Sequence, residues 1–238
     1  MRKDGDAVKK TMWIQGLALT GLLTGVAAWL LRWRLLTTGV DEMGLLLPGR
    51  PLAVISWILT AGMVILVAVC LWKHRNVKIS IGRSPLCEIL RILVMLMAAN
   101  LTWRLALLGK LTAIAAVATA VACVWGLLRG KKPLHPAIAD IPAVLCFLLS
   151  LLCCYQVWSA EPETQRFFYP LLSLVCLMIA TYSRSAIALG CGKSNVFLGT
   201  GLLGVFFSFA AGADPGYLVL FPALGLWMFA QLGLVTEE

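Results

Sequence analysis

Long apolar stretches recur along almost the whole chain, and they constrain its fold more than any other feature. A stretch of about 20 such residues can cross the ~30 Å hydrocarbon layer as a helix, because each helical residue rises about 1.5 Å. The candidate stretches are 12–31, 52–72, 89–108, 111–128, 141–159, 168–189, 195–212 and 216–234. The sequence therefore predicts an all-α fold, a polytopic transmembrane helix bundle of about eight spans.

The composition supports a membrane bundle. Of the 238 residues, 61% are apolar and 13% are charged, whereas soluble domains average about 45–50% apolar and about 25% charged residues. A core of this size cannot enclose so much apolar surface. We expect one transmembrane domain over 1–238 with no soluble domain. A parallel duplication with halves 12–128 and 141–234 is an alternative to an undivided bundle.

The third and fourth stretches, 89–108 and 111–128, are separated only by Gly109 and Lys110. Together they are too long for one ordinary span, because a span needs about 17–25 residues. A tight hairpin between two helices is the better interpretation. Pro222 lies inside the last stretch and is expected to kink that helix, because proline lacks a backbone donor.

The basic residues are distributed unequally between the two sides of such a bundle. If the N-terminus is cytoplasmic, the inner segments contain Arg2, Lys3, Lys9, Lys10, Lys73, Arg75, Lys78, Arg83, Arg129, Lys131, Lys132 and Lys193. The outer segments contain only Arg32, Arg34, Arg50, Lys110 and Arg166. This asymmetry obeys the positive-inside rule and predicts that both termini are cytoplasmic.

The formal charge of +9 could suggest nucleic acid binding, but the basic residues flank apolar stretches, where they set the membrane topology. We therefore expect no nucleic acid partner. The expected partners are membrane lipids, with anionic lipids at the cytoplasmic face attracted by the basic clusters. A partner membrane protein is a further possibility.

Charged and polar side chains inside apolar spans are candidates for function, because they are expensive to bury in lipid. Asn100 and Arg104 are four residues apart in the third stretch, while Glu88 and Arg91, three apart near its start, can pair. In the sixth stretch, Tyr182 and Arg184 belong to a polar run at 181–185. We expect these residues to line one cavity that suits an anionic solute. The alternative is that each arginine extends its stem to the headgroups as an anchor.

Motifs of the common membrane and soluble enzymes do not occur. The chain contains neither HExxH nor GxSxG, and it has no Walker A sequence. The eight cysteines form no CxxC pair and lie mostly within apolar stretches, where they are typical packing residues. We expect no catalytic residues, no metal and no cofactor, and a protein without enzymatic activity is the favoured interpretation. An intramembrane enzyme acting on lipid is a further hypothesis, for which the sequence has no recognisable constellation of residues.

Two short segments carry a resemblance. The sequence Thr-Gly-Val-Asp-Glu-Met-Gly-Leu-Leu at 38–46 follows a helix that ends Arg32-Trp33-Arg34, and the aromatic run Phe-Phe-Tyr-Pro occupies 167–170. Both resemble a group of uncharacterised bacterial multi-pass membrane proteins. The resemblance implies a bacterial cytoplasmic membrane and no particular activity.

Two hypotheses for function follow from the sequence. The first is transport or binding of a small solute, possibly anionic, within the helix bundle. It depends on the polar residues inside the spans. Such residues are energetically unfavourable in lipid, so their presence there suggests a function. The alternative is a non-catalytic membrane subunit or scaffold, in which every in-span arginine is only an anchor.

The apolar stretches make a direct prediction about solubility. We expect the protein to stay with the membrane fraction after an alkaline carbonate wash and to need detergent for extraction, because its outer surface is apolar. A purified protein that remained dissolved and monomeric in plain buffer would contradict the transmembrane bundle.

Overall fold

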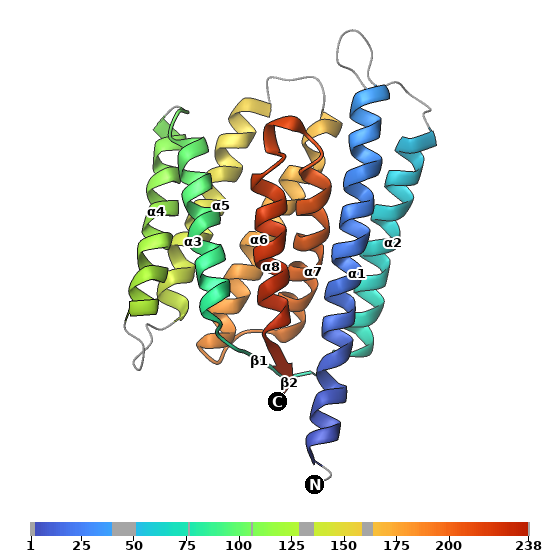
Figure 1. Ribbon diagram of the computed structural model, residues 1–238, viewed down its shortest axis with the longest axis vertical. Helices are drawn as coiled ribbons and strands as arrows, with labels where there is room; N and C mark the ends of the chain where they lie inside the picture. Colours follow the sequence, from blue (N-terminus) through green and yellow to red (C-terminus); the bar gives the residue numbers. More distant parts are fainter. Residues whose placement is uncertain are drawn as a thin grey trace.

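The computed structural model describes residues 3–39, 51–75, 77–105, 107–128, 136–158 and 164–237. These residues form eight α-helices that run roughly parallel or antiparallel to one another (Figure 1). The helices are α1 (Lys3–Thr38), α2 (Pro51–Lys73), α3 (Pro85–Thr102), α4 (Leu107–Leu128), α5 (Pro136–Trp158), α6 (Thr164–Ala188), α7 (Ser194–Ala211) and α8 (Leu220–Gly233). The all-α class predicted from the sequence is thus confirmed. The basic cluster at 129–132 and most of the segment at 38–46 lie outside the described residues.

Seven of these helices, α1 to α7, are long and apolar enough to cross a membrane. Their outward faces are apolar as well: the α2 side chains of Ile58 and Ile65 are 65% and 62% exposed, and Leu128 on α4 is 77% exposed. Apolar side chains facing outward along whole helices are compatible with a lipid surrounding.

The last helix differs from its prediction over 216–234. A 3-10 turn occupies Pro215–Tyr217, and α8 begins only at Leu220, so that its 14 residues span about 21 Å at the usual helical rise. Pro222 lies in the first turn of α8 instead of its middle. A proline there removes a donor that has no helical partner anyway, so Pro222 breaks no backbone hydrogen bond within α8.

The third and fourth apolar stretches form two separate helices, α3 and α4, as predicted. They pack side by side as a hairpin, and α3 ends at Thr102 while α4 starts at Leu107. Proline begins α2, α3 and α5 at Pro51, Pro85 and Pro136. Its ring fixes φ near the helical value, so proline is favoured at the first helical position.

The helices pack in a defined order. α7 packs against α1, α2, α6 and α8, while α3, α4 and α5 pack in sequence and connect to the rest through α3–α8 and α5–α6 contacts. α7 is the most enclosed of the seven long helices, and its Phe197, Val205 and Phe206 are wholly buried. α8 also contacts α3 and α6, so it borders the space between these helices.

A small antiparallel ribbon closes one end of the bundle. β1 (Ile79–Ile81) pairs with β2 (Val235–Glu237), and the start of α1 lies at this same end (Figure 1). We call this end the terminal face. The Trp13 indole N–H donates to the Glu237 carboxylate and its ring stacks on His74 at 4.0 Å, so α1, α2 and the C-terminal strand are joined there.

Small residues let α1 approach α7. A Cβ atom added at Gly25 would lie 3.1 Å from Phe209 Cβ and 3.3 Å from Phe206 Cα on α7. Gly21, one turn earlier, faces Met63 and Leu202 at ordinary contact distance. The Gly21–Gly25 pair thus serves packing within the chain, as GxxxG pairs do in membrane helices.

We expect Gly25→Leu to separate α1 from α7 and to lower the unfolding free energy by about 1–3 kcal/mol, the usual cost of overpacking. Gly16→Leu on the same helix is the matched control, because a Cβ there meets no atom within 4 Å. Thermal unfolding in detergent would measure both variants. Equal melting temperatures for the two would contradict the close α1–α7 contact.

Candidate functional site

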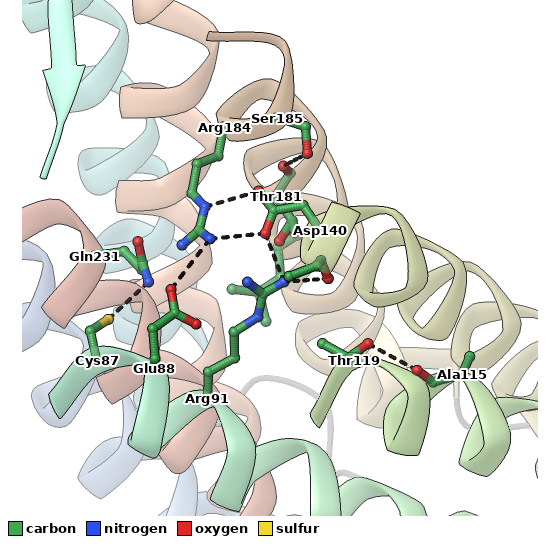
Figure 2. A network of polar contacts seen from close by, with 12 residues as sticks. Cys87, Glu88, Arg91, Ala115, Thr119, Asp140, Thr181, Arg184, Ser185 and Gln231 are labelled. Carbon is green, nitrogen blue, oxygen red and sulfur yellow. Dashed lines mark hydrogen bonds and ion pairs between the residues drawn. The ribbon is translucent and has the colours of Figure 1, made fainter. Parts of the chain in front are cut away.

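Three helices each direct a charged side chain to one point inside the bundle (Figure 2). Asp140 of α5 accepts two hydrogen bonds from Arg184 of α6, from Nε at 3.0 Å and from Nη2 at 2.9 Å. Arg91 Nη2 of α3 lies 2.7 Å from the same carboxylate and also donates to the Ala139 carbonyl at 3.0 Å. One acid is therefore shared between two guanidinium groups.

This pairing is deeply buried. Arg91 and Asp140 are 0% exposed, and Arg184 is 8% exposed. A charge removed from water costs several kcal/mol unless it is paired and hydrogen-bonded. The shared carboxylate thus compensates two cations that the surrounding apolar helices cannot solvate.

Glu88, one helical turn before Arg91 on α3, completes the cluster. Its carboxylate lies 3.8 Å from Arg184 Nη2, and its side chain is 20% exposed. Beside it, the Gln231 amide of α8 donates to the Cys87 sulfur at 2.8 Å. We call Glu88, Arg91, Asp140 and Arg184 the charged cluster, and its formal charges sum to zero.

Several donors of the cluster have no acceptor among the described residues. The Arg91 Nε and Nη1 atoms are buried without a hydrogen-bond partner, and so is the indole nitrogen of Trp227, whose ring lies 5.4 Å from Arg91 Cζ. Arg184, by contrast, donates from both Nε and Nη2 to Asp140 (Figure 2). Unpartnered buried donors are uncommon in folded proteins and require an explanation.

Local sequence explains how the helices present these groups. Glu88 and Arg91 are three residues apart and share a helical face. Arg91 lies six residues into α3, which is roughly 9 Å from its start, and Asp140 and Arg184 are one turn from the ends of α5 and α6 that lie at the terminal face. The cluster therefore lies just inside that end of the bundle.

A pocket of about 580 Å³ leads from the terminal face to the cluster. Its cationic residues are Lys78, Arg83 and Arg184, and its one acidic residue is Glu88. Further lining residues are polar or apolar, among them Ser80, Ser84, Ser194, Gln231, Ile79, Ile187 and Leu234. The wall of the pocket thus combines charged, polar and apolar residues, and it includes Glu88 and Arg184 of the charged cluster.

The structure brings together three of the six predicted site residues, Glu88, Arg91 and Arg184. The ion pair of Arg91 is with Asp140 instead of with Glu88, its neighbour on α3. The remaining three residues lie elsewhere. Tyr182 is 64% exposed on the outer face of α6.

The other two, Asn100 and Arg104, do not share a helical face, because α3 ends at Thr102 and Arg104 is exposed in the turn that follows. Asn100 lies in a separate, largely apolar groove of about 440 Å³ between α3 and α4, lined also by Trp103 and Ile114. Neither residue contributes to the charged cluster.

Asp140 is the cluster member that the sequence analysis missed. The predicted fifth span began at residue 141, so Asp140 counted as part of the preceding connection. The structure starts α5 five residues earlier, at Pro136. A single acid between Ala139 and Ile141 was the available signal, because an isolated carboxylate within an apolar run needs a buried partner.

Metal binding has no support in the described part of the chain. No group of three or more His, Cys, Asp or Glu side chains there is placed to hold a metal ion, and the cysteines are free thiols. The pocket instead presents guanidinium groups and hydroxyls, which are groups that bind oxyanions.

No protein-family model, curated protein or solved structure matches this chain. Its function must therefore be inferred from the fold and the charged cluster.

We expect Asp140→Asn to destabilise the protein by about 3–5 kcal/mol, the cost of leaving a buried charge without its partner. Chemical unfolding in mixed micelles would measure this loss. Arg104→Gln is the control, because that exposed charge touches none of the cluster, and we expect it to change stability by less than about 0.5 kcal/mol.

A double variant sharpens this prediction. Removing one cation as well, in Asp140→Asn with Arg184→Gln, should cost less than the two single changes added together, with a coupling energy of at least about 1 kcal/mol. Strict additivity would show that Asp140 and Arg184 do not stabilise each other.

Proposed function

We propose that the protein is a multi-pass membrane protein that binds a small organic anion in the pocket at the terminal face, as the binding step of solute transport. The observation that carries this proposal is the set of cationic side chains that line the pocket, Lys78, Arg83 and the Arg184 guanidinium of the charged cluster. An oxyanion group placed against Arg184 would exploit the forked geometry of guanidinium.

The charge of the pocket favours an anion. Three cationic side chains, Lys78, Arg83 and Arg184, face a single acid, Glu88. A cleft lined with one excess sign of charge raises the local concentration of the opposite ion and speeds its association. A cation would meet repulsion at the same entrance.

The size and lining of the pocket favour an organic anion over a bare inorganic ion. Its volume of about 580 Å³ lies in the range of about 300–1,000 Å³ that is typical of small-molecule sites. Apolar side chains such as Ile187 and Leu234 border it beside the polar ones. This combination suits a ligand with one charged end and one apolar end.

The proposal includes an orientation. The described basic residues Lys73, Arg75, Lys78, Arg83 and Lys193 belong to segments at the terminal face, and the positive-inside rule assigns such a face to the cytoplasm. The pocket would then open to the cytoplasm. The bacterial cytoplasmic membrane expected from the sequence is part of this proposal.

A structural role is the rival explanation. The charged cluster also cross-links α3, α5 and α6, and a membrane subunit or scaffold could use it for that alone. The two roles differ in one measurable respect: only a binding site responds to an added anion.

We expect benzenesulfonate and benzoate to raise the melting temperature of the detergent-solubilised protein in a saturable way, because a ligand that binds only the folded state stabilises it. Arg184→Gln should weaken the affinity at least about tenfold, which corresponds to the loss of one charged hydrogen bond. Arg104→Gln should bind as the wild type does, and tetramethylammonium should have no effect.

Two outcomes would count against the proposal. One is a melting temperature that does not respond to any of the anions while Arg184→Gln is still folded. The other is an equal response of the wild type and Arg184→Gln, which would place the anion elsewhere. A stoichiometric partner protein co-purifying from mild detergent, together with no anion response, would favour the scaffold.

A further inference from the structure

The groove between α3 and α4 lies apart from the charged cluster and has a chemistry of its own. The α3–α4 hairpin forms one edge of the bundle, and its turn lies at the end opposite the terminal face (Figure 1). Ala99 and Ala113 are the buried lining residues of the groove, and their short side chains leave a hollow of about 440 Å³ between the helices. The remaining lining residues are exposed; they are Asn100, Trp103, Ile114 and Val117.

The surface that continues the groove toward the terminal face is apolar. Leu93 and Leu96 precede the groove on α3, Val121 follows it on α4, and all three are exposed. Residues four and seven apart share a helical face, so these side chains lie in line with the lining residues Asn100, Ile114 and Val117. In a membrane such a surface contacts acyl chains.

Asn100 is the exception on this surface. Its side chain is exposed, and its amide forms no hydrogen bond with any other described residue. An amide that faces hydrocarbon without a partner is energetically unfavourable. Asn100 lies only two residues before the end of α3, where a phospholipid presents its ester groups between the acyl chains and the headgroup. Their carbonyl oxygens are the acceptors that the amide needs.

Trp103 and Lys110 mark the headgroup end of the groove. Trp103, which is 58% exposed, follows Asn100 by about one turn, and tryptophan prefers the boundary between hydrocarbon and headgroups. Lys110 is exposed and precedes Ile114 by four residues on α4, so both lie on the helical face that borders the groove. The order of apolar hollow, amide, indole and ammonium matches the order of acyl chain, ester and phosphate along one phospholipid.

The charge of the hairpin favours an anionic headgroup. The chain contains no Asp or Glu between Glu88 and Asp140, so no acid on this part of the hairpin offsets Lys110. Arg104, exposed in the turn between the helices, adds a second cation at the same end. Basic side chains at the membrane surface attract lipids with a net negative charge.

We propose that this groove binds one phospholipid with an anionic headgroup. One acyl chain lies against Ala99 and Ala113, the Asn100 amide donates to an ester carbonyl, and the Lys110 ammonium pairs with the phosphate. This inference rests on the membrane location given in the proposed function, and it is independent of the anion pocket at the terminal face.

Native mass spectrometry tests the site on protein released from micelles that contain equal amounts of phosphatidylglycerol and phosphatidylcholine. The two lipids have the same acyl chains and differ in the net charge of the headgroup. We expect one phosphatidylglycerol to stay bound in preference to phosphatidylcholine. Lys110→Gln should weaken its binding about threefold, the value of one exposed ion pair. Asn100→Leu should weaken it by about the same factor, because it removes one hydrogen bond.

Lys193→Gln is the matched control, because Lys193 is an exposed lysine at the start of α7, at the terminal face. This variant should retain phosphatidylglycerol as the wild type does. The melting temperatures of all three variants in lipid-free detergent should equal that of the wild type, because each replaced side chain is exposed. Loss of bound lipid would then not arise from unfolding.

Several outcomes would overturn the inference. Equal retention of the two lipids, or the same loss in Lys193→Gln as in Lys110→Gln, would remove the anionic lipid from the groove. Displacement of the lipid by inorganic phosphate would assign a free anion instead. A dimer or a co-purifying protein that excludes the lipid, and that Asn100→Leu releases, would assign the groove to a protein partner.

The same measurements separate this inference from the proposed function. Loss of the lipid preference with an intact melting-temperature response to benzenesulfonate would overturn the lipid site alone. A protein that stays monomeric in plain buffer without detergent would overturn the membrane location and the lipid site together.

Discussion

The sharing of Asp140 between Arg91 and Arg184 is the interaction on which the interior of this bundle depends. Each guanidinium would be strongly destabilising among apolar helices without a counter-charge. Because the three residues come from α3, α5 and α6, satisfying the charges also holds those helices in one arrangement. Asp140 has no exposed surface, so its contribution cannot be replaced by water.

The rest of the fold places this charged cluster at the base of an accessible pocket. α7 forms the packed centre, and α1 approaches it closely at Gly25. The β1–β2 ribbon and the stacked Trp13 and His74 rings join the chain segments at the terminal face. The pocket lies among these segments and the ends of α3 and α6, and Arg184 and Glu88 line it.

Much of the fold could be predicted from the sequence, because apolar stretches of spanning length report directly on helix number and position. The α3–α4 hairpin followed from length alone. The start of α8 did not, since the apolar stretch begins at residue 216 while the helix begins only at Leu220, after the 3-10 turn at Pro215–Tyr217.

The site was harder to predict, because hydropathy does not tell which in-span residues face one another. Glu88, Arg91 and Arg184 were found as polar residues in or beside apolar stretches, whereas Asp140, the common partner of the two arginines, lay one residue outside its predicted span. Asn100 and Arg104 looked equally suitable by spacing. The early end of α3 at Thr102 separated them, and that end is set by the turn into α4 instead of by any local polar signal.

The central proposal is that Arg184, where it lines the pocket, receives an anion. Crystals grown with bromobenzenesulfonate test it most directly, because the bromine gives an anomalous signal that locates the ligand. The account predicts a bromine peak in the pocket, with the sulfonate beside the Arg184 guanidinium. A peak confined to the groove between α3 and α4, or a pocket left empty at saturating ligand, would contradict it.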